Sequence, residues 1–254
     1  MAWGLIPIAA AISIVQGLHV SSFVNLNGPL MLVTVCVNFV LIHGYRRYGW
    51  KDLLVFFAIS VVFGMFFENL SIATGFPFGY YHYTDTLGPK FIYSPYILTI
   101  AYFQMLYMTW PLAGLVVDSY ANKLKGAYIV VQPVIAAFIM VMWDMVIDPH
   151  MSIMSGHWVW HAGGAYFGVP STNNMGWFLC VYTMNQSFAV YLAKWGRAAT
   201  PEVVSTKKFW LPLAAIYLTW PLSFLIKGFF IPATTVTHST ATSGTRATCT
   251  RPPA

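Results

Sequence analysis

Long apolar stretches separated by short polar segments dominate the pattern of this chain. Each stretch approaches the roughly 20 residues that an α-helix needs to cross the hydrocarbon core of a bilayer. Helices are expected because an open sheet would leave backbone groups unpaired in hydrocarbon. The pattern predicts an all-α membrane protein, with about seven transmembrane helices forming one domain over residues 1–233. The stretches are Ala2–Val20, Pro29–His43, Leu53–Thr74, Tyr93–Val117, Ala127–Ile147, Met175–Ala193 and Phe209–Ile231.

Basic residues predict the orientation of these helices. They gather in the second, fourth and sixth loops, whereas the first, third and fifth loops contain only Lys90. Cytoplasmic loops of membrane proteins carry an excess of Lys and Arg. We therefore expect the three basic loops to be cytoplasmic and the N-terminus to be non-cytoplasmic. The residues concerned are Arg46, Arg47, Lys51, Lys123, Lys125, Lys194, Arg197, Lys207 and Lys208.

Composition supports a membrane-embedded chain. Hydrophobic residues make up 58% of the sequence and charged residues 8%, whereas soluble domains carry about a quarter charged residues. The net charge of +6 does not indicate nucleic-acid binding, because no basic stripe accompanies a soluble fold. Cys36, Cys180 and Cys249 have no disulfide or metal spacing. Residues 234–254 are rich in Thr and Ser without periodicity, and they predict a disordered tail.

Three acidic residues lie in or at the end of apolar stretches. They are Glu68 in the third stretch and Asp144 and Asp148 at the end of the fifth. A charged side chain near the middle of a membrane-spanning helix costs roughly 2.5–3.5 kcal/mol, so such residues indicate a functional site. The expected topology places all three toward the same, non-cytoplasmic side. We expect the acids to converge on one cavity.

The third and fifth loops are rich in glycine, proline and aromatic residues. Gly75, Pro77 and Gly79 break the helix after Glu68. Pro149 disfavours helix beyond Asp148, and the glycines of the fifth loop make regular structure unlikely there. The fifth loop is too apolar to be a solvated linker. It predicts a re-entrant or interfacial segment between the fifth and sixth helices that covers a site.

Four histidines map to the same side, which raises the possibility of a metal site. They are His82, His150, His157 and His161. His157 and His161 have helical ligand spacing, but the surrounding Gly and Trp residues argue against a helix, and no HExxH motif is present. We expect no metal and assign these side chains to hydrogen bonding or proton exchange.

The third and fifth loops and their borders carry several recognisable motifs. They are FEN at Phe67–Asn69, TGFPFGYYHYT at Thr74–Thr84, LGP at Leu87–Pro89, DPH at Asp148–His150 and GHWVWHAGGAYFGVPSTNNMGW at Gly156–Trp177. In combination they resemble the motifs of the integral-membrane carotenoid biosynthesis proteins, a family that includes hydratases of acyclic carotenoid ends. Asn174 departs from the family pattern, which has an aromatic residue there, and Tyr93–Pro95 lacks the expected Gly-Val-Pro.

The resemblance implies addition of water across the terminal double bond of a long apolar isoprenoid. Such an alkene reacts by protonation, which gives a tertiary carbocation that water captures. The reaction needs a carboxylic acid kept protonated by apolar surroundings, aromatic faces that stabilise the cation and a small polar pocket. It needs no cofactor. We expect Glu68 or Asp144 to be the acid, and Asp148 to orient water or its partner. The substrate-binding candidates are the aromatic residues Tyr80, Tyr83, Trp158, Trp160 and Tyr166 and the amides Asn69 and Asn173.

Two other functions fit the same residues. A membrane terpene cyclase also begins with protonation, but an internal double bond captures its cation. The sequence does not separate capture by water from capture by carbon. A proton-coupled transporter would use the acids as a relay, and its acids would be spread through the depth of the bilayer. The clustering of Glu68, Asp144 and Asp148 toward one face favours the enzyme.

Overall fold

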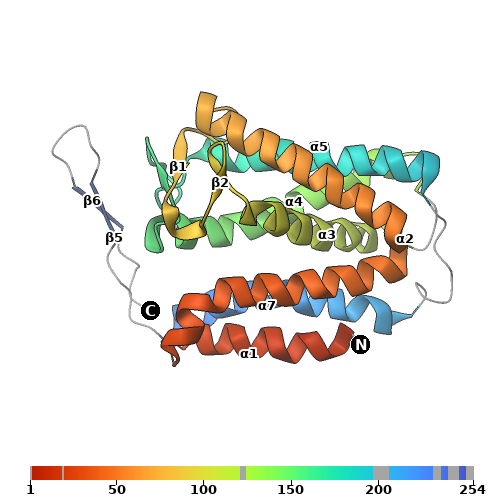
Figure 1. Cartoon of the computed structure of the whole chain (residues 1–254), viewed down its shortest axis with the longest axis horizontal. Helices are drawn as coiled ribbons and strands as arrows, with labels where there is room; N and C mark the ends of the chain where they lie inside the picture. The colour runs from red at the N-terminus through yellow and green to blue at the C-terminus, as the bar shows by residue number, and fades with distance from the viewer. Residues whose placement is uncertain are drawn as a thin grey trace.

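The fold was analysed in a computed structural model that describes residues 2–18, 20–120, 124–196, 206–230, 236–239 and 246–249. Helices form most of the described chain (Figure 1). The helices are α1 (Leu5–Gly17), α2 (Ser22–Thr74), α3 (Ile97–Val116), α4 (Tyr128–Asp148), α5 (Ser171–Trp195) and α7 (Lys207–Phe230).

Helix α2 contains both the second and the third predicted stretches. The polar segment between them remains helical, and only Gly49 departs from helical geometry, with φ 73° and ψ 173°. Glycine reaches such angles without the clash that a Cβ atom would cause. The chain therefore bends at Gly49 rather than forming a loop. The two parts of α2 lie in different groups of helices, one with α1 and α7 and the other with α3, α4 and α5 (Figure 1).

Among the residues that the structure describes, three helical segments are long and apolar enough to span a membrane. They are Leu30–Thr74, which includes the bend, Tyr128–Met154 and Lys208–Ile226. Helix α1 is apolar but shorter. These segments support a membrane protein, and the larger number of about seven crossings stays a prediction.

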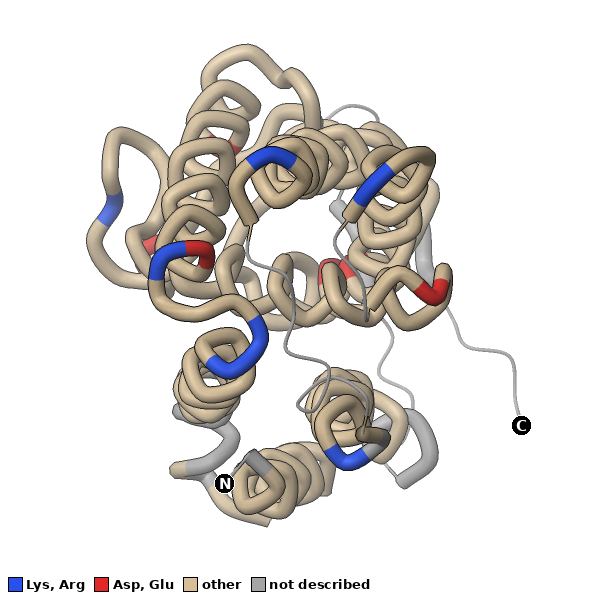
Figure 2. The backbone as a smooth tube through the Cα atoms, turned by 90° about the vertical axis from the view of Figure 1, so that its right-hand side faces the viewer, with Lys and Arg blue, Asp and Glu red and all other residues tan. Residues whose placement is uncertain are grey.

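The arrangement of the helices conflicts with part of the predicted orientation. The N-terminal end of α1 and the bend of α2 lie at the same end of the bundle (Figure 1), where Lys and Arg positions gather (Figure 2). A non-cytoplasmic N-terminus and a cytoplasmic bend therefore cannot both hold in this structure. If the bend is cytoplasmic, as its Arg46 and Arg47 indicate, the start of α1 is cytoplasmic as well. Lys123 and Arg197 lie outside the described residues.

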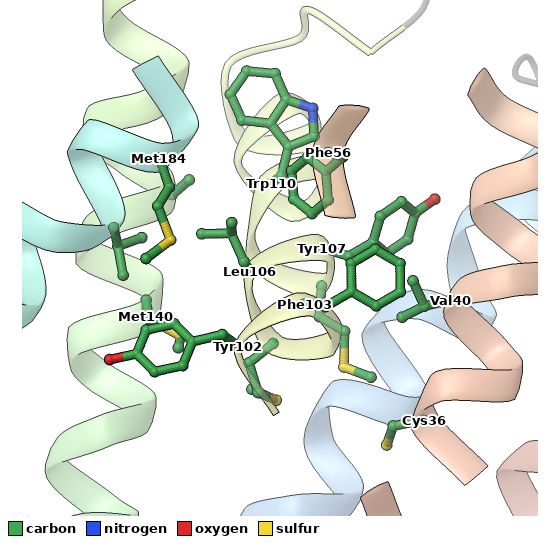
Figure 3. Packing of buried hydrophobic residues seen from close by; sticks show 14 of the residues in the cluster. Cys36, Val40, Phe56, Tyr102, Phe103, Leu106, Tyr107, Trp110, Met140 and Met184 are labelled. Carbon is green, nitrogen blue, oxygen red and sulfur yellow. The ribbon is translucent and has the colours of Figure 1, made fainter. Parts of the chain in front are cut away.

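Helix α3 lies at the centre of the larger group of helices. Its side chains from Tyr102 to Pro111 are all buried, as expected for a helix that is apolar on every face. Tyr102 points toward Met140 of α4 (Figure 3), and the Tyr107 hydroxyl lies 2.8 Å from Nδ1 of His43 of α2. Neighbouring helices contact α3 on several sides, and this packing holds Tyr102 in a fixed position.

The segment after α4 corrects two expectations about the fifth loop. The helix does not stop at Pro149, because a wider helical turn continues from Pro149 to Met154. The loop then forms a strand, β4 (Trp158–Trp160), which pairs with β1 (Tyr81–Tyr83) of the third loop. A proline inside a helix removes its own N–H and crowds the carbonyl four residues earlier. The carbonyl four residues earlier, that of Met145, accepts a hydrogen bond of 3.0 Å from the Tyr166 hydroxyl instead.

Two further strand pairs complete the described chain. Strands β2 (Lys90–Phe91) and β3 (Ser94–Pro95) form a hairpin before α3. In the predicted tail, β5 (Val236–Ser239) pairs with β6 (Arg246–Cys249). The remaining residues of the tail lie outside the described part of the chain, so its disorder stays a prediction.

Candidate active site

A two-stranded antiparallel ribbon, β1 with β4, carries aromatic side chains to the end of the bundle. Tyr81 lies opposite Trp160, and Tyr83 lies opposite Trp158. Alternate residues of a strand face opposite sides, so Tyr81 and Tyr83 are buried whereas His82 between them is exposed. The Tyr81 and Trp160 rings lie 4.8 Å apart, and the Tyr83 and Trp158 rings lie 5.8 Å apart.

Glu68 is buried in α2 beneath this ribbon, with 2% of its surface exposed. Its Oε2 atom accepts hydrogen bonds from the hydroxyls of Tyr81 and Tyr83, the latter at 3.0 Å. Its Oε1 atom accepts a hydrogen bond of 2.7 Å from Tyr102 of α3. Burial and then the negative charge of Glu68 raise the pKa of Tyr83 well above its usual value, so Tyr83 remains a hydrogen-bond donor. Three hydroxyl donors thus surround one carboxyl group.

Asp144 and Asp148 form a second buried group one helical turn apart in α4. The Nδ2 atom of Asn173, in the first turn of α5, donates to Oδ2 of Asp144 at 3.0 Å and to Oδ2 of Asp148 at 2.6 Å. The indole N–H of Trp158 donates to the other oxygen of Asp148 at 2.9 Å. Two carboxyl groups therefore share one amide nitrogen.

Two side chains connect the two groups of acids. Tyr83 and Trp158 link the groups, because each binds one of the acids while their rings are in edge contact. The acids of α2 and α4 are thus connected through two side chains, and their convergence on one cavity stays a prediction. The catalytic role of each residue stays a proposal.

Some of the predicted substrate-binding residues lie elsewhere. Tyr80 is 56% exposed and covers Gly75 on the outside of the turn. Asn69 binds the carbonyl of Met65 and accepts a hydrogen bond from the backbone N–H of Tyr93. It therefore holds the β2–β3 hairpin rather than the acids. Tyr166 binds the end of α4. Of the predicted residues, Tyr83, Trp158, Trp160 and Asn173 are those that the structure brings to the acids.

Two residues that bind Glu68, Tyr81 and Tyr102, were not among the predicted site residues. Tyr81 could be chosen over Tyr80 only once the strand and its inward face were known. Tyr102 lies within an apolar helix, where nothing in the local pattern marks it. Its ring stacks on Trp177 of α5, with centroids 5.1 Å apart. A tyrosine at such a position has to find a partner for its hydroxyl, and this is the one signal that could have indicated it.

The histidines make hydrogen bonds on the outer face of the ribbon. Nδ1 of His82 lies 2.9 Å from Nε2 of His161, and Nδ1 of His157 lies 2.8 Å from the Thr86 hydroxyl. Burial lowers the pKa of His157. The ring of His150 packs against Phe224 of α7. Within the described residues, no group of three or more His, Cys, Asp or Glu side chains has an arrangement that could hold a metal ion.

Comparison with known proteins identifies the family. No curated protein and no solved structure matches the chain. One protein family, described as Carotenoid biosynthesis protein, matches residues 28–241. This range includes the two parts of α2, the β1–β4 ribbon and every residue around the acids. The chain, with its buried acids beneath an aromatic ribbon, belongs to the carotenoid biosynthesis protein family.

Proposed function

We propose that this protein is a carotenoid hydratase, which adds water to the terminal double bond of an acyclic carotenoid. The observation that carries the proposal is the pairing of two different carboxyl environments in one aromatic site. Asp144 and Asp148 share a single amide donor, whereas Glu68 has three hydroxyl donors. Membership of the carotenoid family supports the lipophilic substrate.

The aspartate pair is the better candidate for the proton donor. Two carboxyl groups within reach of one nitrogen repel each other when both are charged, so one of them favours holding a proton. Paired acids of this kind deliver protons in other enzymes. The hydroxyls around Glu68, in contrast, stabilise a carboxylate. The sequence left Glu68 and Asp144 equivalent as candidates, and these contacts favour the aspartate pair.

The reaction then proceeds without a further reagent. The aspartate pair transfers its proton to the less substituted carbon of the double bond, and the positive charge develops on the tertiary carbon. The faces of Trp158 and Trp160 stabilise this cation. Water adds through its oxygen and gives up one proton to the Glu68 carboxylate. Proton exchange between Glu68 and the aspartates restores the starting state, so the net change is addition of one water.

The test is the mass of pigments from cells that make an acyclic carotenoid and express this chain. We expect a product heavier by one water. Asp144→Asn and Glu68→Gln should each reduce its amount by about 10²-fold or more, as loss of a positioned acid or base does. Asp85→Asn is the control, because Asp85 is an exposed carboxylate that pairs with Lys90 at 2.9 Å.

The alternatives give different products in the same experiment. A pigment of unchanged mass and altered retention would replace hydration with cyclisation. Unaltered pigments in cells that contain the folded protein would contradict both reactions and favour a transporter. Equal activity of Asp144→Asn and wild-type protein would overturn the assignment of the aspartate pair as the acid.

A further inference from the structure

An apolar groove lies between α2, the first turn of α3 and the β2–β3 hairpin. Its volume is about 630 Å³, within the range of roughly 300–1,000 Å³ typical of small-molecule sites. Its lining includes Val62, Met65 and Phe66 from α2, Ile92 from the hairpin, and Tyr96 and Thr99 at the start of α3. The groove is separate from the cavity near Arg47 at the opposite end of the bundle.

The Asn69 amide and the Thr99 hydroxyl, two of the polar groups that line the groove, are already hydrogen-bonded. The Asn69 amide donates to the Met65 carbonyl and accepts from the Tyr93 N–H, at 2.7 and 2.9 Å. The Thr99 hydroxyl donates to the Tyr96 carbonyl at 2.7 Å. Because these groups have no need of a ligand, the groove suits a hydrocarbon rather than a headgroup or a sugar.

The two helices that form the groove also form the acid site. Met65 of α2 lies one turn before Glu68, and Thr99 of α3 lies one turn before Tyr102. Residues three apart lie on the same side of a helix. Helices α2 and α3 therefore contribute the Tyr102–Glu68 hydrogen bond and, one turn away, residues that line the groove. A chain in the groove would have one end within a helical turn of the site.

The hairpin wall of the groove is fixed in an unusual conformation. Ile92 has φ 59°, a left-handed value that is rare for a β-branched residue. The Tyr93 N–H bond to Asn69 and the Tyr96 N–H bond to the Pro89 carbonyl hold the turn on either side. Such conformations persist where surrounding contacts enforce them, and they are concentrated at ligand sites. The turn presents the exposed side chains of Phe91 and Ile92 to the groove.

We propose that this groove binds the conjugated chain of the acyclic carotenoid while its terminal double bond reaches the acids. The inference rests on the proposed function for the identity of the reaction. A polyene is favoured over a flexible lipid tail because the rings of Phe66, Phe91 and Tyr96 flank the groove, and flat rigid rings pack well on a flat rigid chain. The groove therefore favours a rigid polyene over a flexible lipid tail, and the acid site acts on the end of the bound polyene.

The experiment measures how much acyclic carotene stays bound to purified protein in lipid nanodiscs, by absorbance. Val62→Trp fills the groove from an exposed position on α2, and Leu54→Trp places the same side chain at another exposed position on α2. Ile92→Asn makes the rim polar with a residue that tolerates the left-handed backbone. We expect Val62→Trp and Ile92→Asn to weaken carotene binding about ten-fold, a loss of about 1.4 kcal/mol, and Leu54→Trp to leave it unchanged.

Binding and reaction give separate answers. Asp144→Asn should bind carotene like the wild-type protein while forming about 10²-fold less product. Wild-type binding by Val62→Trp, or equal displacement of carotene by oleate at equal concentration, would overturn the groove proposal. Loss of carotene binding in Val62→Trp would support the groove proposal. If cells that express the wild-type protein nevertheless contain only unhydrated pigment, the groove proposal would stand and the hydratase proposal would be overturned.

Discussion

Tyr102 of α3 donates a hydrogen bond of 2.7 Å to Glu68 of α2 while its ring stacks on Trp177 of α5. One side chain thus connects three helices at the acid site. Gly64 of α2 permits this approach, since a Cβ atom there would lie 3.1 Å from the Tyr102 ring. The position of Tyr102 is therefore set by packing, and its hydroxyl supplies the contact with the acid.

Tyr102→Phe tests that contact, because it keeps the stacked ring and removes the hydroxyl. A hydrogen bond to a charged group contributes about 1.5–3 kcal/mol, and we expect a loss of this size in the free energy of unfolding, together with slower formation of product. Denaturant unfolding in detergent and pigment analysis measure the two effects. Tyr80→Phe, at an exposed ring, should change neither. A variant as stable and as active as wild type would mean that Glu68 does not depend on Tyr102.

The predictable part of the fold is the part that depends on local hydropathy. Each predicted apolar stretch lies largely within a helix, because helix formation in apolar surroundings needs no distant partner. The segment between the second and third stretches was wrongly expected to be a loop. Arg46, Arg47 and Lys51 are good helix formers, and Gly49 alone bends the chain. The polar residues therefore located the change of direction between the two stretches, but they did not predict that this segment is helical.

The acid site was predictable in position and less so in composition. The spacing of the stretches placed Glu68, Asp144 and Asp148 at one end of the bundle. The choice between Tyr80 and Tyr81 depends on the register of β1 against β4, which pairs residues about 80 positions apart. Tyr102 depends on the packing of α3 against α2 and α5. Such long-range relationships have no counterpart in the local pattern.

Asn173→Ala is expected to destabilise the protein by about 1–3 kcal/mol, because the amide shared by Asp144 and Asp148 is lost. Adding Asp144→Asn should restore part of this stability, since an amide would then face Asp148 in place of a second acid. Thermal unfolding of the two variants and their combination measures the coupling. Asn174→Ala is the neighbouring control, because its buried side-chain oxygen bonds to none of the described residues. Additive effects of Asn173→Ala and Asp144→Asn would contradict the shared contact.

Acidification is expected to loosen the β1–β4 ribbon near His157. Burial lowers the pKa of this histidine in the folded protein, so the opened ribbon binds a proton more readily than the closed one. Stability is therefore complete above the usual pKa of about 6.5 and is lost as the pH falls below it. Hydrogen exchange of the Thr84 N–H, which bonds to the His157 carbonyl at 3.0 Å, reports the opening at each pH.

His157→Asn removes the titrating group and keeps a side chain that can bond to the Thr86 hydroxyl. The protection of the Thr84 N–H, which is its exchange rate relative to that of an unstructured peptide at the same pH, should then lose its dependence on pH in this range. His82→Asn is the matched control on the same ribbon. A pH dependence that survives in His157→Asn and disappears in His82→Asn would assign the effect to the His82–His161 pair instead.

Gly176→Ala is expected to separate α5 from the turn that precedes β1. A Cβ atom at Gly176 would lie 2.7 Å from the Phe78 ring and 2.8 Å from the carbonyl group of Pro77. Because backbone atoms cannot move aside as a flexible side chain does, we expect a loss of about 1–3 kcal/mol. Unfolding measurements on this variant and on Gly4→Ala, where a Cβ atom would meet nothing within 4 Å, provide the comparison. Equal stability of the two variants would contradict the close packing of Gly176.

Tyr166 and Pro149 form a pair that separates structural support from substrate contact. Pro149 has no N–H to bond to the Met145 carbonyl, and the Tyr166 hydroxyl donates to that carbonyl at 3.0 Å. Tyr166→Phe should therefore destabilise the protein by about 1 kcal/mol, because a part-buried acceptor loses its hydrogen bond, without changing which product forms. In a Pro149→Ala background the new N–H can bond to Met145, so the same substitution should cost much less.

The measurement is a double-mutant cycle of unfolding free energies, with pigment analysis of each variant. An equal cost in both backgrounds would assign the Tyr166 hydroxyl another partner, and an altered product at unchanged stability would place its ring against the substrate, as the sequence first indicated.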